Sequence, residues 1–286
     1  MQCFEDGAVF EHFDREAFKF QHKLMGHPAL SLENLARVIP ALPPKRVMYS
    51  MGRLKEGDDF EGTFSRKPAE RSIEETIENI RVSDSYVMVS GPEIDPSFAS
   101  LHRELIGDVE SLMRRHGVGT EAVDPQLYLF IASPNSVTPF HIDRYSTFLM
   151  QFRGSKEVTV FPQWDERVVT AVQREAYVSY ANTRLSWSKE TDALGTCFAF
   201  QPGEAIHIPF VAGHHVRNGP DDVSISMSII FNTRQSMAWR RALNFNHASR
   251  RVLGRFGMAP APIGAQAWRD SAKSGLWQAA SRLRGR

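Results

Sequence analysis

The feature that most constrains the fold is a series of short β-rich segments between residues 126 and 232, separated by Gly, Pro and Asn. The segments lie at residues 127–132, 147–152, 158–161, 197–200, 205–208, 215–217 and 223–231. Many short strands with turn residues between them are typical of an all-β sandwich or barrel. With 286 residues, 42% of them hydrophobic, the chain is long enough to bury such a core. We therefore expect a soluble globular protein.

Residues 1–125 have a different pattern, typical of helices with a few short strands. Apolar residues at helical spacing, a capping box at Ser72 and Glu75, and the helix-breaking Pro43 carry this prediction. The expected elements are helices at about 31–43, from 72, and at about 98–116, with strands at 47–49 and 86–89. We expect this mostly helical part to pack on the β-rich part, residues 126–233.

Charge is distributed unevenly along the chain. Residues 234–286 contain eleven Lys or Arg and a single acid, Asp270, which gives a net charge of +10. Residues 1–233 contain 23 basic and 32 acidic residues and carry −9, so the total of +1 conceals an acidic body and a basic tail. Apolar residues among the arginines predict one or two amphipathic helices in this C-terminal segment.

The cysteines and the N-terminus bear on the compartment. Cys3 and Cys197 are far apart and match no zinc-binding spacing, so reduced thiols are expected. The N-terminus is acidic where a secretory signal would be basic, and no apolar run approaches the roughly 20 residues that a membrane helix needs. We therefore expect a cytoplasmic protein without a membrane partner.

Residues 141–143, with the sequence His-Ile-Asp, place two metal-ligand side chains two residues apart. In an extended strand such side chains point to the same face. A third ligand is available in Gly-His-His at 213–215. Two histidines and one carboxylate leave open positions on an octahedral ion, as in the non-haem Fe(II) oxygenases. His207, His214 and His215 compete for the third place, and strand neighbours face opposite ways, so His214 and His215 are not expected to bind one ion.

Lys156 lies 15 residues after His141. A strand that follows the His-Ile-Asp strand and runs antiparallel beside it would bring the lysine ammonium back toward the metal. There the ammonium would bind the distal carboxylate of an oxo-acid that chelates the ion. A solvated turn lysine is the alternative interpretation, and the spacing does not decide between the two.

Four motifs in fixed order extend this pattern over residues 127–231. They are Thr-Pro-Phe-His-Ile-Asp at 138–143, Phe-Arg-Gly-Ser-Lys at 152–156 with Val-Phe-Pro at 160–162, Gly-Glu-Ala-Ile-His-Ile-Pro at 203–209 before Gly-His-His-Val at 213–216, and Val-Ser-Ile-Ser-Met-Ser at 223–228. In these motifs the chain resembles the cupin-like JmjC-domain Fe(II)- and 2-oxoglutarate-dependent hydroxylases, and is similar to the asparaginyl hydroxylase that acts on hypoxia-inducible factor. The resemblance implies a mainly β fold, a double-stranded β-helix or jelly roll with a helical N-terminal part and C-terminal helices.

The resemblance also implies the ligands and the co-substrate contacts. It makes His141, Asp143 and His214 the ligands of Fe(II), and it makes His207 a pocket-lining or structural residue. The residues that it assigns to 2-oxoglutarate are Lys156 and Thr138 at the C5 carboxylate, Tyr86 near it, Thr147, and Ser228 where relatives often have asparagine. The match of Tyr86 rests on spacing, and a buried strand tyrosine remains an equal interpretation.

The implied activity is that of a dioxygenase. It uses O₂ and 2-oxoglutarate, forms succinate and CO₂, and hydroxylates a C–H bond of an amino-acid side chain in a protein or peptide, or of a small metabolite. The alternative is a non-catalytic metal-binding sensor or regulatory protein with the same fold. A transcription regulator or histone demethylase is less favoured, because no helix-turn-helix, zinc-finger or methyl-lysine reader motif is visible in the sequence.

The same resemblance bears on the basic tail. Helices that follow the jelly roll often form a homodimer in this family, so we expect a homodimer through residues 234–286. The acidic body and the basic tail would then be complementary surfaces of one assembly. Nucleic acid is the second candidate partner for the tail.

Overall fold

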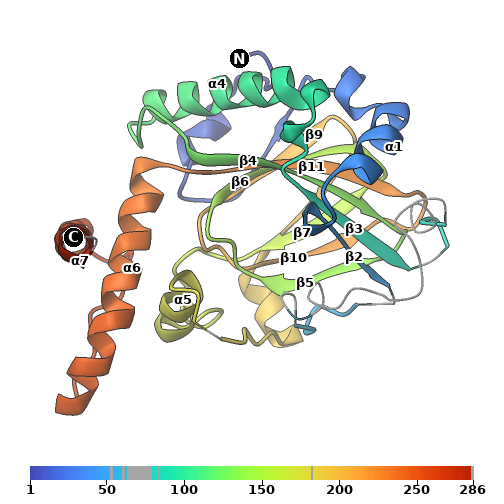
Figure 1. The fold of residues 1–286 in the computed structure, drawn as a ribbon. Helices are drawn as coiled ribbons and strands as arrows, with labels where there is room; N and C mark the ends of the chain where they lie inside the picture. Colours follow the sequence, from blue (N-terminus) through green and yellow to red (C-terminus); the bar gives the residue numbers. More distant parts are fainter. Residues whose placement is uncertain (52–53, 60–61, 63–78, 83, 182, 285–286) are drawn as a thin grey trace.

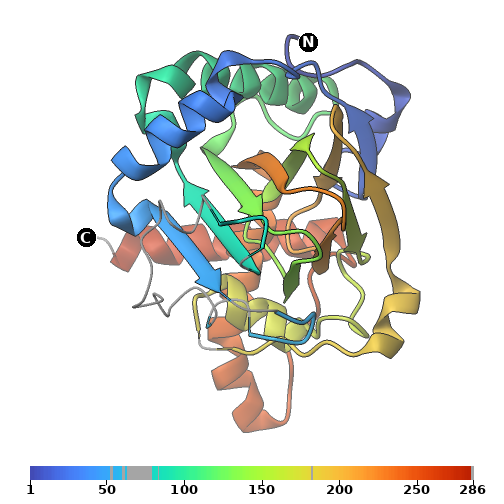
Figure 2. The same cartoon turned by 90° about the vertical axis from the view of Figure 1, so that its right-hand side faces the viewer.

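The computed structural model describes residues 1–51, 54–59, 62, 79–82, 84–181 and 183–284. In this part of the chain, antiparallel strands form a larger sheet of order β1-β9-β6-β11-β4-β3-β2 and a smaller sheet of order β5-β10-β7-β8 (Figures 1 and 2). The strands are β1 Phe18–Gln21, β2 Val47–Met51, β3 Ser85–Ser90, β4 Val123–Ala132, β5 Val137–His141, β6 Ser146–Arg153, β7 Lys156–Val160, β8 Thr196–Phe200, β9 Glu204–Ile208, β10 His214–Asn218 and β11 Ser224–Asn232.

The two sheets face each other across a shared apolar interior. Leu149 and Ile206 of the larger sheet belong to the same buried cluster as Val158 and Val216 of the smaller sheet. This arrangement confirms the predicted jelly roll with flanking helices. The short strand β1 was not predicted, although its residues alternate between buried and exposed and it pairs with β9.

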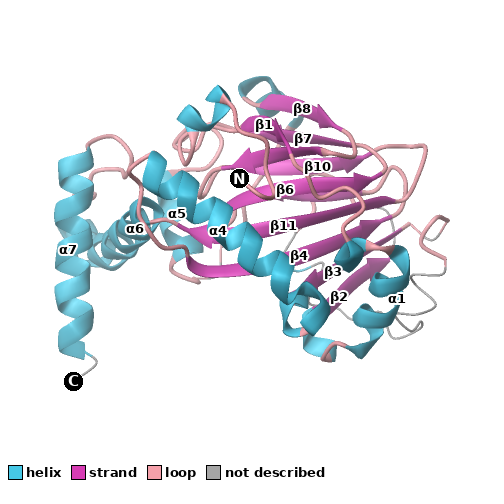
Figure 3. Cartoon of the chain, turned by 90° about the horizontal axis from the view of Figure 1, so that it is seen from above, coloured by secondary structure: helices cyan, strands magenta, loops and turns pink. Residues whose placement is uncertain are grey.

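Helices α1 Leu32–Ala41 and α4 Ala99–Arg115 cover the outer face of the larger sheet (Figures 1 and 3). The buried residues of α4 include Leu101, Leu105 and Leu112, which share one helix face and pack into the main core. Full burial of one leucine stabilises the fold by about 1.5–3 kcal/mol, which explains why α4 is held on the sheet. Both helices confirm predictions, whereas the predicted helix from Ser72 lies outside the described residues.

Helices α5 Ala171–Val178, α6 Arg234–Leu253 and α7 Ala267–Arg284 lie at one end of the sheets, and α6 and α7 extend away from them (Figures 1 and 3). We call α6 and α7 the C-terminal arm. Leu243 of α6 is buried with Val178 of α5 in a second apolar cluster. The buried carboxylate of Glu175 in α5 accepts two hydrogen bonds of 2.8 Å from the guanidinium of Arg250 in α6. Across the described part of the chain, no helix has both the length and the apolar character needed to span a membrane.

Arg250→Ala is expected to lower the free energy of unfolding by about 3 kcal/mol, because it leaves the Glu175 carboxylate buried without its cation. This value is at the lower end of the range for such a change, since the Arg250 side chain is 25% exposed. Urea denaturation measures the loss. The control is Arg251→Ala, at an exposed neighbouring position, which should change stability by less than about 0.5 kcal/mol. An equal loss in both variants would contradict a stabilising role for the ion pair.

Candidate active site

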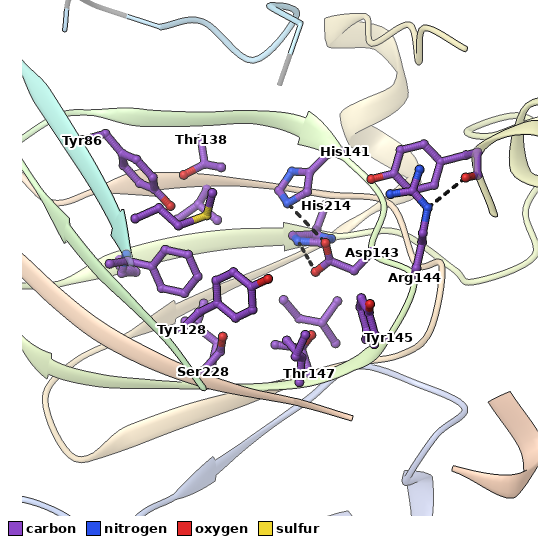
Figure 4. Close-up of a pocket in the computed structure, with 18 residues that line it drawn as sticks. Tyr86, Tyr128, Thr138, His141, Asp143, Arg144, Tyr145, Thr147, His214 and Ser228 are labelled. Atoms are coloured by element: carbon purple, nitrogen blue, oxygen red, sulfur yellow. Dashed lines mark hydrogen bonds and ion pairs between the residues drawn. The ribbon is translucent and has the colours of Figure 1, made fainter. Parts of the chain in front are cut away.

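His141 and His214, from neighbouring strands of the smaller sheet, lie together with Asp143. One ligand atom from each residue lies within 4.8 Å of the others. The Asp143 carboxylate oxygens lie 3.9 Å from His141 Nε2 and 3.6 Å from His214 Nε2 (Figure 4). Both imidazoles are buried, whereas Asp143 is partly exposed. Elsewhere in the described chain, no group of three or more His, Cys, Asp or Glu is arranged to hold a metal ion.

Hydrogen bonds fix which imidazole nitrogen faces Asp143. His141 Nδ1 is 2.8 Å from the carbonyl of Pro139, and His214 Nδ1 is 3.0 Å from the carbonyl of Ala212. Because a carbonyl only accepts, each Nδ1 carries a proton, and each Nε2 keeps a lone pair for a metal. Burial, with a smaller contribution from His214, lowers the pKa of His141 to about 4, so this ring is neutral at physiological pH, as ligation requires.

The pairing of β5 with β10 brings the two histidines together. His141 lies opposite His214, while Thr138 lies opposite Val216, so three steps along β5 match two steps along β10. This bulge falls at Pro139 and Phe140, and Pro139 has no N–H to give to the partner strand. The two imidazole rings are tilted, with centroids 4.1 Å apart.

The prediction that His141 and Asp143 share an extended strand is wrong. β5 ends at His141, and Asp143 lies in the connection to β6, residues 142–145, which we call the ligand loop. The backbone N–H of Val211 donates to the Asp143 carbonyl at 3.0 Å. This bond holds the ligand loop outside the sheet, and the loop itself turns the carboxylate toward the histidines.

The structure separates the three histidines that compete in the sequence. His215 faces away from His214, and its Nε2 is 3.0 Å from the Asp192 carboxylate. Both ring nitrogens of the buried His207 are within hydrogen-bond distance of backbone groups, at 3.1 Å each. Only His214 of the three faces Asp143 in the described structure.

A cavity of about 250 Å³ adjoins the three residues, and its lining includes all five residues assigned to 2-oxoglutarate. Tyr86 and Thr138 lie on one side of it, and Thr147 and Ser228 lie on the other (Figure 4). The hydroxyls of Tyr86 and Thr138 are hydrogen-bonded to each other, and burial raises the pKa of Tyr86 above its ordinary value. Thr147 Oγ1 is buried and has no hydrogen-bond partner among the described residues.

Lys156 also lines the cavity and is only 4% exposed, which does not fit a solvated turn lysine. Burial lowers its pKa to about 7. Within the described structure its ammonium makes no hydrogen bond or ion pair. The route predicted for it is wrong, because β7 pairs with β10 and β8 rather than with β5. β10 separates β5 from β7, so the ammonium reaches the cavity from one strand further along the smaller sheet.

Further residues of the cavity wall, which no sequence pattern assigned to the site, are Met88, Tyr128, Phe130, Arg144 and Tyr145, and Tyr177 joins them from the segment between β7 and β8. Four of the six tyrosines of the chain line this one cavity, but they are far apart in the sequence and only the fold brings them together. Burial raises the pKa of Tyr128 to about 12, so its hydroxyl stays protonated and can donate a hydrogen bond.

The long segment between β7 and β8 lies only partly at the site. Tyr177 of α5 lines the cavity, and the guanidinium of Arg144 lies 3.8 Å from its ring centre. Trp187 instead packs against His215, and Trp164 packs against Trp239. The segment therefore contributes one side of the cavity mouth through α5, which is itself fixed to the C-terminal arm.

The sequence profile of the cupin-like domain matches residues 31–237. This match covers most of the chain and contains every residue of the candidate site. The chain therefore belongs to the cupin-like domain family. A comparison with curated proteins found no match.

Solved structures share the fold. The ribosomal oxygenase YcfD of Escherichia coli is similar over 98% of this chain and 67% of its own chain, with a TM-score of 0.50 and 14% identity. The oxalate decarboxylase of Lactobacillus farciminis is similar over 38% of this chain, with a TM-score of 0.26 and 20% identity, and the match spans 25% of its own chain. The chain thus spans about a quarter of the length of that decarboxylase. At such identities, the similarity to YcfD shows the fold alone.

His214→Ala is expected to lose bound iron, because it removes an Nε2 that faces Asp143. His215→Ala should keep its iron, because that ring faces Asp192 instead. Elemental analysis of each variant, loaded anaerobically with Fe(II) and desalted, measures the difference. Thermal melting of both variants controls for misfolding. If His215→Ala loses metal while His214→Ala keeps it, the assignment is wrong.

Proposed function

We propose that the protein is an Fe(II)- and 2-oxoglutarate-dependent oxygenase that hydroxylates a C–H bond. The observation that carries the proposal is a His-Asp-His face and a buried, unpaired lysine ammonium in one cavity. The face suits Fe(II) with positions left open, and the ammonium suits the distal carboxylate of an oxo-acid. A protein that only binds a metal has no need of the second feature.

The donor atoms fit Fe(II). Two imidazoles and one carboxylate are hard or borderline ligands, and the Nδ1 hydrogen bonds of His141 and His214 hold both rings in place. When bound, the ion supplies the redox chemistry that couples O₂ reduction and decarboxylation of 2-oxoglutarate to hydroxylation. The protein contributes the positions of these groups and the cavity that holds them.

The part of the cavity that is lined by Lys156, Tyr86 and Thr138 fits 2-oxoglutarate. Lys156 would hold the C5 carboxylate through a charge-assisted hydrogen bond, and the hydrogen-bonded pair of Tyr86 and Thr138 hydroxyls offers one further donor. Thr147 Oγ1, which lacks a partner in the described structure, would gain one from the ligand. Donors that are already in place need little reorganisation when the co-substrate binds.

We infer that the substrate is a side chain of a protein or peptide, with a small metabolite as the second candidate. Tyr128, Tyr145, Tyr177 and Arg144 line the cavity together with Asp143. Tyrosine and arginine are the residue types enriched where proteins bind other polypeptides. The ribosomal oxygenase YcfD has the same fold, which agrees with oxygenase chemistry on this scaffold.

Succinate formation tests the proposed activity. Purified protein is incubated with Fe(II), 2-oxoglutarate, O₂ and cell extract, with Asp143→Ala as the inactive control. We expect extract-dependent succinate from the wild type and a product of +16 Da by mass spectrometry. Iron binding without succinate would favour the alternative, a non-catalytic metal-binding sensor.

Lys156→Ala is expected to raise the 2-oxoglutarate concentration for half-maximal succinate formation by about 10- to 100-fold, since a hydrogen bond to a charged group contributes about 1.5–3 kcal/mol. Iron content should stay at the wild-type level by elemental analysis. Lys156→Met, which keeps the apolar volume of the stem, should behave in the same way. An unchanged requirement in both variants would remove this lysine from the co-substrate site.

The affinity for 2-oxoglutarate should depend on pH through the same lysine. With a pKa of about 7, Lys156 is charged below pH 7 and neutral above it, and the carboxylate needs the charged form. The dissociation constant should stay level below pH 7 and rise by at most about tenfold per pH unit above it. Calorimetry of the Mn(II)-loaded protein in two buffers at pH 8 should detect proton uptake. Lys156→Met should bind 2-oxoglutarate weakly and should take up no proton at this position.

We further propose that the protein forms a homodimer through the C-terminal arm. Trp268, Leu276 and Leu283 of α7 are 69%, 58% and 76% exposed and lie eight and seven residues apart, so they form one apolar stripe. An exposed stripe of this kind favours a protein partner. Nucleic acid, the second candidate, would satisfy the arginines of the arm but would leave this stripe uncovered.

Leu276→Glu combined with Leu283→Glu is expected to convert a dimer into a monomer of 32.3 kDa, measured by light scattering. Val172→Glu, at a residue of α5 that is 52% exposed, is the control and should remain dimeric. Point variants are preferred to removal of residues 234–286, because α6 buries Leu243 in the fold. A monomeric wild type would overturn the dimer.

A further inference from the structure

Asp14 is a buried carboxylate that the proposed chemistry does not use. It is 1% exposed and has a left-handed backbone φ of 63°. One oxygen accepts a hydrogen bond of 2.6 Å from Ser146 Oγ, and the other accepts one of 2.6 Å from Thr233 Oγ1. Such short distances are typical of hydroxyls that donate to an ionised carboxylate. Since no cation pairs with it among the described residues, its burial is unfavourable unless the two hydroxyls compensate.

The two hydroxyls come from neighbouring strands of the larger sheet, at the start of β6 and just after the end of β11. Ser146 is the first residue of β6 and directly follows the ligand loop that carries Asp143. Thr233 is the N-cap of α6, and its Oγ1 accepts a hydrogen bond of 2.9 Å from the Ser236 N–H. Because the hydrogen of the Thr233 hydroxyl is donated to Asp14, a lone pair of Thr233 Oγ1 is free to accept the Ser236 N–H. One carboxylate thus orients both the end of the ligand loop and the first turn of the C-terminal arm.

A third bond fixes Asp14 itself. Its backbone N–H donates to His207 Nε2 at 3.1 Å, and His207 Nδ1 is 3.1 Å from the Thr147 carbonyl. The start of β6 is therefore held from two sides, through Ser146 and through Thr147. Thr147 also lines the cavity, so this network reaches the wall of the site.

We propose that Asp14 is a positioning residue that joins the ligand loop to the C-terminal arm and thereby places Asp143 for metal binding. The proposal depends on the proposed function only in taking Asp143 as a metal ligand. The ligand loop is anchored by the Val211 N–H at the Asp143 carbonyl and by Asp14 at Ser146. Arg144 Nε also donates to the Tyr177 carbonyl at 2.9 Å, and Ser146 pairs with Phe231 in the sheet. Asp14 adds the anchor at the side chain that ends the loop, and its loss loosens the loop there, whereas a metal ligand must be placed to within about 0.5 Å.

Asp108 of α4 provides a matched control. It is also a buried carboxylate, and it anchors the same N-terminal region by accepting hydrogen bonds from the N–H groups of Gln2, Cys3 and Phe4 at 2.9, 2.7 and 3.2 Å. It does not line the cavity and does not contact the ligand loop. A purely structural loss near the N-terminus should therefore be the same in both variants, while an effect on the site should be specific to Asp14.

The experiment uses the full-length, metal-free protein for amide hydrogen exchange and Mn(II) as the metal probe. Asp14→Ala is expected to speed exchange by about tenfold in peptides that cover residues 142–149 and 233–239. It should also weaken Mn(II) binding by about 10- to 100-fold, the usual effect of removing a group that supports a ligand. Asp14→Asn keeps one acceptor oxygen and should give intermediate values. Asp108→Ala should change neither peptide and leave Mn(II) affinity within about twofold of the wild type.

Wild-type exchange in residues 142–149 of Asp14→Ala, or wild-type Mn(II) affinity, would overturn the proposal. If Asp14→Ala does not fold, Ser146→Ala removes only the link to the ligand loop, and normal Mn(II) affinity in that variant would be equally decisive. A wild-type protein that binds no Mn(II) would refute the proposed metal centre instead. The exchange comparison would still decide the role of Asp14, because it is made without metal.

Discussion

The antiparallel pairing of β5 with β10 is the interaction on which the site depends. It places His141 opposite His214, just beside the bulge at Pro139 and Phe140. Side chains alternate along a strand, so a slip of one residue in β10 would present His215 in place of His214. The register of one strand pair therefore decides which histidine can face Asp143. β7, which pairs with β10 along its other side, helps to hold β10 in this register.

The cavity gathers groups whose burial is unfavourable while they lack partners. Burial lowers the pKa of the Lys156 ammonium, and Thr147 Oγ1 has no hydrogen-bond partner in the described structure. The fold tolerates these losses because its apolar clusters supply far more stabilisation than two such groups remove. A ligand that pairs with them binds the folded state alone and so adds to its stability. The same groups that lower the stability of the empty protein would thus give it affinity for the proposed dicarboxylate co-substrate.

Much of the fold followed from local pattern, and much of the site did not. The β-rich segments, helices α1 and α4 and the helices of the C-terminal arm were predicted because alternation and helical spacing are visible within a few residues of sequence. The position of Asp143 beyond the end of β5 and the route of Lys156 through β7 were mispredicted, because both depend on which strands pair. Asp14 contacts residues 132 and 219 positions away in the sequence, and no local sequence pattern predicts such contacts. The His-Ile-Asp motif and the candidate third ligands were visible in the sequence itself, while the choice of His214 and the co-substrate residues came from the family resemblance, which carries long-range information.

β5 lies at the edge of the smaller sheet, and an edge strand with free N–H groups is a template for pairing with another chain. Here the N–H of Phe140 donates to the carbonyl of Glu56 at 2.7 Å, so this position of the edge offers no free donor to a neighbour. The segment around Glu56, which covers the edge beside the ligands, thus also helps to protect the protein against aggregation through this edge.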